Sequence, residues 1–250
     1  MWCNVIHRII LFLIISLLFT CSLSAGDKTV RLATDPWAPF YGPELKNGGF
    51  FTEIVRESFK RSGYKLTVDF IPWKRAVIQS KDGRYDGLLG AFHSKERETF
   101  YIYSNPVSSS SLVFFSKKDR DIHYTSLNDL ITYQIGTIRG YTYSPEFDNA
   151  DYLHKQPVKE ALMNVKKLLK GRIDILIDSR AVILDILKKE FPDQVDTIKI
   201  IEPPLKVNRL YVPISKKKKN AQQLVDALNK GFREITEDET YYRILESHGF

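Results

Sequence analysis

Two runs of alternating strand-like and helix-like segments constrain the fold of this chain most strongly. Short apolar or alternating stretches indicate strands, and apolar residues three or four positions apart indicate helices. The expected strands lie at 30–33, 65–71, 88–92, 133–138, 173–177 and 197–201, with helices at 51–61, 73–81, 158–170 and 180–191 between them. Such alternation is typical of parallel sheets flanked by helices. We therefore expect an α/β fold in which each run forms a mostly parallel sheet.

The two runs also predict two lobes. No Pro/Ser-rich tether lies between them, so we expect the lobes to share a tight hinge. A strand-like segment at 210–214 and two helix-like segments then bring the chain back to the first lobe. The predicted connections between the lobes lie near 107–113 and 207–212. Lobe 1 is therefore expected to comprise 26–109 and 211–250, and lobe 2 to comprise 110–210.

The first 25 residues have the pattern of a secretory signal peptide. Arg8 supplies the positive charge, an apolar run follows at 9–19, and small residues precede a cleavage site near Ser24 or Ala25. The apolar run is too short for a comfortable membrane span. There are two alternatives: a lipid anchor on Cys21, which the bulky residues before this cysteine disfavour, and an uncleaved membrane anchor. We expect a soluble periplasmic protein of about 225 residues after cleavage.

Composition excludes several classes of function. Both cysteines, Cys3 and Cys21, lie in the leader, so the mature chain has neither a disulfide nor a nucleophilic thiolate. The formal charge of +7 falls to +6 without Arg8 and is diffuse apart from the lysines at 216–219. Nucleic-acid binding would need basic residues interleaved with aromatic ones on one face. The five histidines lack metal-ligand spacing, and no catalytic motif or phosphate-binding loop is present, so we expect no metal and no cofactor.

Residues suited to ligand binding follow several of the expected strands. In open α/β sheets, ligands bind beyond the carboxyl ends of the strands. An arginine fork grips a carboxylate, an aspartate meets a cation, and aromatic rings form flat apolar walls. Each residue also has a plain structural explanation: aromatic residues pack in cores, Arg97 could be a surface charge, and Asp178 could cap the helix that begins near Arg180. The strand-end residues are Asp35, Trp37, Phe40, Tyr41, Trp73, Phe92, Arg97, Arg139, Gly140, Tyr141, Thr142 and Asp178.

Over nearly its whole mature length, the chain resembles the periplasmic solute-binding proteins of the amino-acid type, solute-binding family 3. The motifs that carry the resemblance, taken in chain order, lie at 34–40, 49–54, 83–86, 96–97, 127–130, 136–140 and 171–174. The resemblance implies a two-lobed periplasmic binding protein fold of type II. It also implies a monomer that is not an enzyme, captures an amino acid or related small carboxylate, and delivers it to the permease of an ABC importer.

The resemblance also implies roles for individual residues. Trp37 falls where the family places an aromatic ring that stacks on the ligand, and Trp73 falls at a side-chain pocket. Arg97 matches the arginine that holds the α-carboxylate, and Asp178 lies near the acid that meets the α-amine. Asp35 stands where a polar ligand side chain is met. The predicted ligand-binding set is Asp35, Trp37, Trp73, Ala91, Phe92, Arg97, Arg139, Gly140, Tyr141 and Asp178.

The chain departs from the family pattern in two places. The turn before Arg97, at 91–94, is about one residue shorter and poorer in hydroxyl groups. The acid of the second lobe comes one residue early, which leaves Ser179 as an alternative to Asp178. Two other functions stay open for such a scaffold. One is a periplasmic enzyme of dehydratase type, for which Asp178 or Glu53 would be the acid or base. The other is a ligand-sensing module for a membrane receptor.

Overall fold

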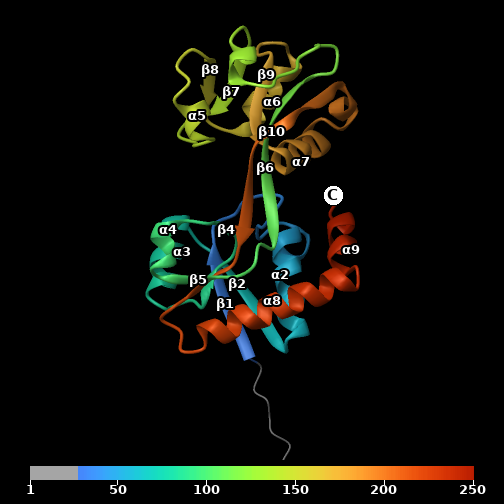
Figure 1. Cartoon of the computed structure of the whole chain (residues 1–250). Coiled ribbons are helices and arrows are strands. Elements are labelled where there is room, and N and C mark those ends of the chain that lie inside the picture. Colours follow the sequence, from blue (N-terminus) through green and yellow to red (C-terminus); the bar gives the residue numbers. More distant parts are fainter. Residues whose placement is uncertain (1–27) are drawn as a thin grey trace, which may run out of the picture.

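The computed structural model describes residues 28–250 and shows two lobes joined by two long neighbouring strands (Figure 1). The predicted leader lies outside the described residues. The strands are β1 Lys28–Thr34, β2 Tyr64–Phe70, β3 Gly87–Leu88, β4 Ala91–Phe92, β5 Tyr101–Tyr103, β6 Ser108–Lys117, β7 Gln134–Ile138, β8 His154–Val158, β9 Ile175–Ser179, β10 Ile198–Tyr211 and β11 Pro213–Ser215. The α-helices are α2 Phe50–Arg61, α3 Trp73–Lys81, α4 Lys95–Glu98, α5 Pro145–Asp148, α6 Ala161–Leu169, α7 Arg180–Glu190, α8 Ala221–Glu237 and α9 Thr240–Ser247. Short 3-10 helices lie at η1 Lys46–Gly48, η2 Leu127–Leu130 and η3 Pro192–Thr197.

Each lobe is built on one sheet, and both sheets are mixed. The strand order is β2-β1-β3-β11-β5 in the sheet of the first lobe and β4-β10-β6-β9-β7-β8 in the second sheet, whose edge strand β4 lies beside the first lobe (Figure 1). In the first sheet β1 is parallel to β2 and β3, whereas β11 is antiparallel to β3 and β5. In the second sheet β7 is parallel to β8 and β9, whereas β10 and β9 run antiparallel to β6. The α/β prediction is confirmed, but the expectation of mostly parallel sheets was wrong, because the chain leaves and re-enters the first lobe through β6 and β10.

Two single strands were predicted incorrectly. The segment 88–92 is broken, and its ends belong to different sheets: β3 pairs with β1, whereas β4 pairs with β10. Gly90, with a φ of +73°, turns the backbone between them. The strand expected at 197–201 continues to Tyr211 instead of stopping at the prolines after Glu202. Its register with β6 shifts between Ile201 and Lys206, and this irregularity accommodates residues that cannot donate a backbone hydrogen bond.

The two connections between the lobes are hydrogen-bonded to each other. The chain passes from β5 to β6 through residues 104–107 and from β10 to β11 through Val212. Ser104 Oγ accepts a hydrogen bond from the Val212 N–H at 3.0 Å, and Val107 N–H donates to the Leu210 carbonyl at 2.9 Å. The segments expected to connect the lobes, 107–113 and 207–212, therefore lie largely inside β6 and β10.

Among the helices of residues 28–250, none is both long and apolar enough to cross a membrane.

The C-terminal helices complete the core of the first lobe. Helix α8 buries Leu224, Leu228 and Ile235 against α2 and the sheet. The helices approach closely at Gly231, where a Cβ atom would stand 1.8 Å from the Ser58 carbonyl oxygen, so no larger residue fits without separating them.

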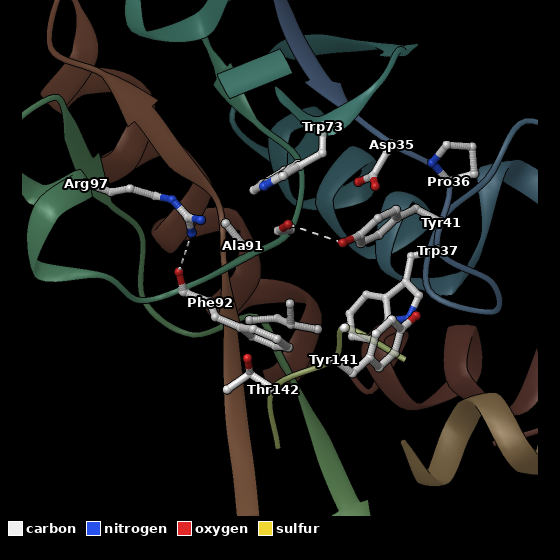
Figure 2. A pocket seen from close by; sticks show the side chains of 13 residues that line it. Asp35, Pro36, Trp37, Tyr41, Trp73, Ala91, Phe92, Arg97, Tyr141 and Thr142 are labelled. Carbon is white, nitrogen blue, oxygen red and sulfur yellow. Dashed lines mark hydrogen bonds between the residues drawn. The ribbon is translucent and has the colours of Figure 1, made fainter. Parts of the chain in front are cut away.

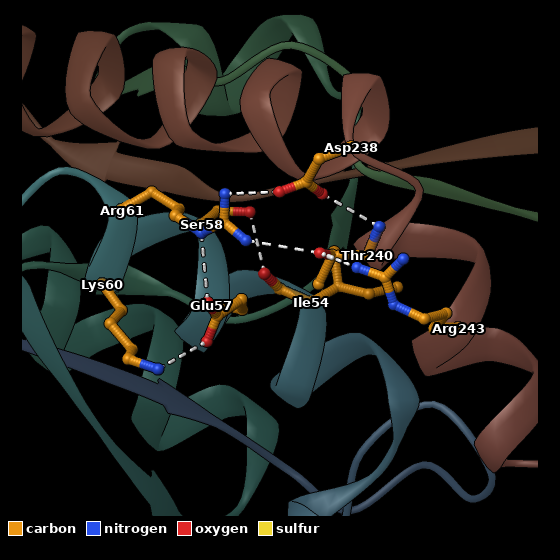
Figure 3. A network of polar contacts seen from close by, with 8 residues as sticks. All are labelled: Ile54, Glu57, Ser58, Lys60, Arg61, Asp238, Thr240 and Arg243. Carbon is orange, nitrogen blue, oxygen red and sulfur yellow. Dashed lines mark hydrogen bonds and ion pairs between the residues drawn. The ribbon is translucent and has the colours of Figure 1, made fainter.

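A polar network fixes the turn from α8 into α9 on the side of α2 (Figure 3). Arg61 Nη1 lies 2.6 Å from Asp238 Oδ2, and Arg61 Nε lies 3.2 Å from Glu57 Oε1. Hydrogen bonds from Thr240, together with Arg61, lower the pKa of Asp238 to about 2. The start of α9 is therefore tied to α2, and this contact helps to fix the position of the chain terminus.

Candidate ligand-binding cleft

A cavity of about 460 Å³ lies between the lobes, on the side where β1, β4 and β7 end (Figure 2). The first lobe contributes most of its walls, and the loop after β7 contributes the far side. The lining residues are Asp35, Pro36, Trp37, Tyr41, Trp73, Gly90, Ala91, Phe92, Arg97, Gly140, Tyr141, Thr142 and Leu210. A cavity with apolar walls and a few polar groups is the usual form of a small-molecule site.

Trp37 forms one wall and is held firmly. Its ring stacks on the buried Phe40, with centroids 4.2 Å apart and planes 14° apart. The backbones of Trp37 and Tyr41 exchange two hydrogen bonds, of 2.8 and 3.1 Å, which close the tight loop that follows β1. The rings of Phe92 and Trp37 make an edge-to-face contact, with centroids 5.9 Å apart and planes 88° apart. Because Trp37 is supported on several sides, its surface in the cleft is preorganised.

Tyr41 and Gly90 form the floor of the cavity. The Tyr41 hydroxyl donates a hydrogen bond to the Gly90 carbonyl oxygen at 3.2 Å, and burial raises the pKa of Tyr41. The phenol therefore stays neutral and acts as a donor. A Cβ atom on Gly90 would stand 2.5 Å from Tyr41 Cε1, so this close approach requires glycine.

Replacing Gly90 with alanine is expected to lower the melting temperature by about 3–10 °C, through overpacking of about 1–3 kcal/mol. Gly140→Ala is the matched control. Gly140 also has a positive φ, of +80°, and also lines the cleft, but nothing lies within 4 Å of its added Cβ. Differential scanning fluorimetry of both variants separates the clash with Tyr41 from the backbone cost that they share. Equal melting temperatures would contradict the proposed packing.

Arg97 lies in α4, the single helical turn after β4. Its Nη1 donates a hydrogen bond to the Phe92 carbonyl oxygen at 3.1 Å, and its guanidinium carbon lies 5.4 Å from the centre of the Trp73 ring. Within residues 28–250, Arg97 forms no ion pair with a carboxylate. A guanidinium carries five N–H donors in a planar fork. Arg97 is therefore oriented by a carbonyl and a ring while its charge remains unpaired at the cavity wall.

Two aspartates supply negative charge near the cleft. Asp35 lines the cavity, and burial raises its pKa. Asp178 lies at the end of β9 and is 5% exposed. Burial raises the pKa of Asp178 to about 6, although the Ser179 N–H, 2.7 Å away, opposes this shift. Neither carboxylate has a basic partner in the described part of the chain.

Tyr141 lines the cavity and is close enough to both acids to interact with their charges. Partial burial and the negative charges of Asp178 and Asp35 raise its pKa. The ring is 59% exposed, although it lines the cavity. The second-lobe side of the cleft is thus open to solvent, and the electrostatic field there favours a cation.

The structure brings together eight of the ten predicted ligand-binding residues: Asp35, Trp37, Trp73, Ala91, Phe92, Arg97, Gly140 and Tyr141. The other two do not line the cavity. Arg139 is exposed, and its backbone N–H donates to the Val158 carbonyl oxygen at 2.8 Å. Asp178 is buried, and its carboxylate accepts a bond from Ser179, whose own hydroxyl accepts one from Ser110 at 3.0 Å. The alternative explanation, that Asp178 caps α7, is not supported, because the residue before the helix is Ser179 and no side chain caps it.

Five lining residues lie outside the predicted ligand-binding set. Tyr41 and Thr142 are among the strand-end candidates, whereas Pro36, Gly90 and Leu210 were not predicted as site residues. Pro36 and Gly90 adjoin predicted positions. Leu210 enters the cavity from β10 because β10 pairs with β4 there, which no local pattern indicates.

Comparison with known proteins identifies the family. The family model for bacterial extracellular solute-binding proteins, family 3, matches residues 30–249. The chain therefore belongs to this family, which binds solutes and is not a family of enzymes. The arginine-binding periplasmic protein of Mannheimia haemolytica is 24% identical over 245 residues, covering 93% of this chain and 96% of that protein. ABC transporter arginine-binding protein 1 of Escherichia coli K12 is 24% identical over 238 residues, covering 91% and 93%.

A solved structure confirms the two-lobed fold class. The open conformation of substrate-binding domain 2 of Lactococcus lactis GlnP superimposes with a TM-score of 0.73 at 22% identity, covering 89% of this chain and 96% of that one.

Proposed function

We propose that this protein binds an amino acid with a positively charged side chain between its lobes and delivers it to the permease of an ABC importer. The observation that carries the proposal is the charge pattern of the cleft. One arginine and two aspartates face or adjoin the same cavity, and none of them forms an ion pair with another described residue. A ligand with one carboxylate and two cationic groups would complement all three charges.

The positions of these groups suggest a role for each. Arg97 has free donors for the α-carboxylate, in a geometry that Trp73 and the Phe92 carbonyl hold. Asp178, at the end of β9 and two residues before α7, would meet the α-ammonium group when the lobes approach each other. Asp35 then meets the cationic side chain.

The aromatic walls suit the same ligand. Trp37, Trp73 and Tyr141 line the cavity beside the acids. Cations bind favourably over such rings, and a planar guanidinium also stacks on them. The two curated relatives above are named as arginine-binding proteins, which makes L-arginine the first ligand to test.

Delivery to a permease requires export and closure. The predicted signal peptide would send the chain to the periplasm, in agreement with the family's description as extracellular. Closure would bend the two connections at 104–107 and Val212, because these are the points where the chain changes sheets.

Titration calorimetry with three related compounds tests the proposal. L-Arginine should bind saturably with one site per chain. L-Citrulline, which has the same shape but a neutral side chain, and agmatine, which lacks the carboxylate, should each bind about 10–100-fold more weakly, because each loses one charged contact of about 1.5–3 kcal/mol. No binding of any amino acid, or equal binding of all three compounds, would contradict the proposal.

A further inference from the structure

The last residues of the chain touch the other lobe. Helix α9 belongs to the first lobe, and its C-terminal end points towards α7 of the second (Figure 1). Lys188 Nζ, on α7, donates a hydrogen bond to the Gly249 carbonyl oxygen at 2.6 Å. The same ammonium group lies 5.7 Å from the centre of the Phe250 ring. We name residues 247–250 together with Lys188 the C-terminal clasp.

On the first-lobe side, the clasp is rigidly anchored. Lys46 Nζ donates to the Ser247 carbonyl oxygen at 3.1 Å, and His248 Nε2 lies 2.7 Å from Glu53 Oε2. The Phe250 ring packs against Phe50, with centroids 4.9 Å apart. The Arg61–Asp238 network holds the opposite end of α9 (Figure 3). The terminus is therefore a fixed part of the first lobe, and Lys188 is its link to the second.

The clasp is formed while the cleft is open. Tyr141 and Phe92 line the cavity and are nevertheless 59% and 40% exposed. No clasp residue lines the cavity, so the clasp and the ligand site are separate contacts between the same two lobes.

Helix α7 couples the two places. It begins at Arg180, directly after Asp178 and Ser179, and it carries Lys188 two turns further along. A rigid displacement that brings Asp178 towards a ligand must also move Lys188 relative to the terminus. The Lys188 ammonium group is held by both the Gly249 carbonyl oxygen and the Phe250 ring, so a displacement of α7 larger than the lysine side chain can follow breaks both contacts.

We propose that the C-terminal clasp stabilises the open arrangement of the lobes and thereby lowers the affinity for the ligand. In this proposal, closure breaks the contact between Lys188 and the terminus. The free energy needed to break it reduces the net free energy of ligand binding. Loosening the clasp should raise the population of the closed form without ligand. It should also tighten binding about three- to tenfold, which corresponds to one hydrogen bond to a charged group at an exposed position.

Lys188→Ala and a deletion of residues 249–250 test this inference, with Lys189→Ala as the matched control. Lys189 is the next residue of α7 and loses the same charge, but it pairs within the helix, with Asp185 at 2.9 Å. Spin labels on Glu44→Cys and Lys159→Cys report the distance between the lobes. Residues 26–250 contain no competing thiol, because both native cysteines, Cys3 and Cys21, precede residue 26.

Without ligand, Lys188→Ala and the deletion should shift the distance distribution towards the distance seen on closure, and Lys189→Ala should leave it unchanged. In calorimetry with L-arginine, the two clasp variants should bind about three- to tenfold more tightly. Distance distributions that match the control, or weaker binding by both clasp variants, would overturn the inference. The affinity measurement rests on the proposed function, whereas the distances without ligand do not. If no amino acid binds, the distances measured without ligand therefore still test whether the clasp stabilises the open arrangement.

Discussion

Replacing Arg97 with alanine is expected to weaken the binding of L-arginine by about 100-fold or more. Arg97 is the cation of the cavity that has donors available for the ligand carboxylate, since its charge is unpaired among the described residues. Truncating one partner of a buried charged pair costs about 2–5 kcal/mol, which corresponds to roughly 30–5000-fold in affinity. Titration calorimetry of wild type and variant gives the ratio directly.

Two further variants sharpen this prediction. Arg97→Lys keeps the charge but loses the planar fork, so it should recover only part of the affinity. Arg75→Ala removes the same charge from α3, away from the cavity lining, and should bind as wild type does. Agmatine, which has no carboxylate, should bind Arg97→Ala and wild type equally. If Arg97→Ala binds L-arginine as tightly as wild type does, Arg97 is a surface charge and the assignment fails.

The affinity for L-arginine is expected to fall as the pH drops below about 6. Burial holds the pKa of Asp178 at about 6, and the α-ammonium group of the ligand requires the charged carboxylate. Above pH 7, Asp178 is ionised and the affinity is constant. Below pH 6, binding must first remove a proton, so the affinity should approach a tenfold loss for each further pH unit. Calorimetry from pH 5 to pH 8 measures this slope.

In the absence of ligand, the ionisation of Asp178 lowers the stability of the folded protein, whereas the same ionisation strengthens ligand binding. The folded-state pKa of Asp178 is raised above its ordinary value of 3.8, so the folded protein binds the proton more tightly than the unfolded chain does. Its contribution to stability is fully present below about pH 4 and is lost as the pH rises through 6. Asp178→Asn should remove this loss and also the pH dependence of binding between pH 5 and pH 7.

The Ser179→Ala variant tests whether Asp178 or its neighbour Ser179 makes the second-lobe contact with the ligand. Ser179 is buried, and its hydroxyl accepts a hydrogen bond from Ser110. We expect Ser179→Ala to keep the pH dependence, whereas Asp178→Asn loses it. The reverse result would assign the second-lobe contact to Ser179.

Much of the fold could be predicted from local pattern. Helix α3 has the bounds that its apolar spacing predicts, from Trp73 to Lys81. The break at Gly90 was missed because one glycine within an apolar run gives no sign of which sheet each half will join. The continuation of β10 past Glu202 was missed because prolines usually end a strand, whereas here they fall at a shift of register.

The site was predictable to the extent that it depends on strand ends. Trp37 follows β1 and Arg97 follows β4. Ligands bind beyond the ends of such strands, which predicts a place for both residues in the site, and both line the cavity. Leu210 could not be found in this way, because its place depends on pairing between segments more than a hundred residues apart. The burial of Asp178 could not be predicted in this way either, because it depends on β9 lying inside the sheet, between β6 and β7.

A crystal structure of the protein with L-arginine is the most direct test of the proposed binding mode. We predict one ligand in the cavity, with its carboxylate on the Arg97 guanidinium and its cationic groups at Asp35 and Asp178. The lobes should be closer together than in the present structure, and the contact between Lys188 and the chain terminus should be broken. A ligand bound elsewhere, or one in the cavity with its carboxylate away from Arg97, would contradict the account.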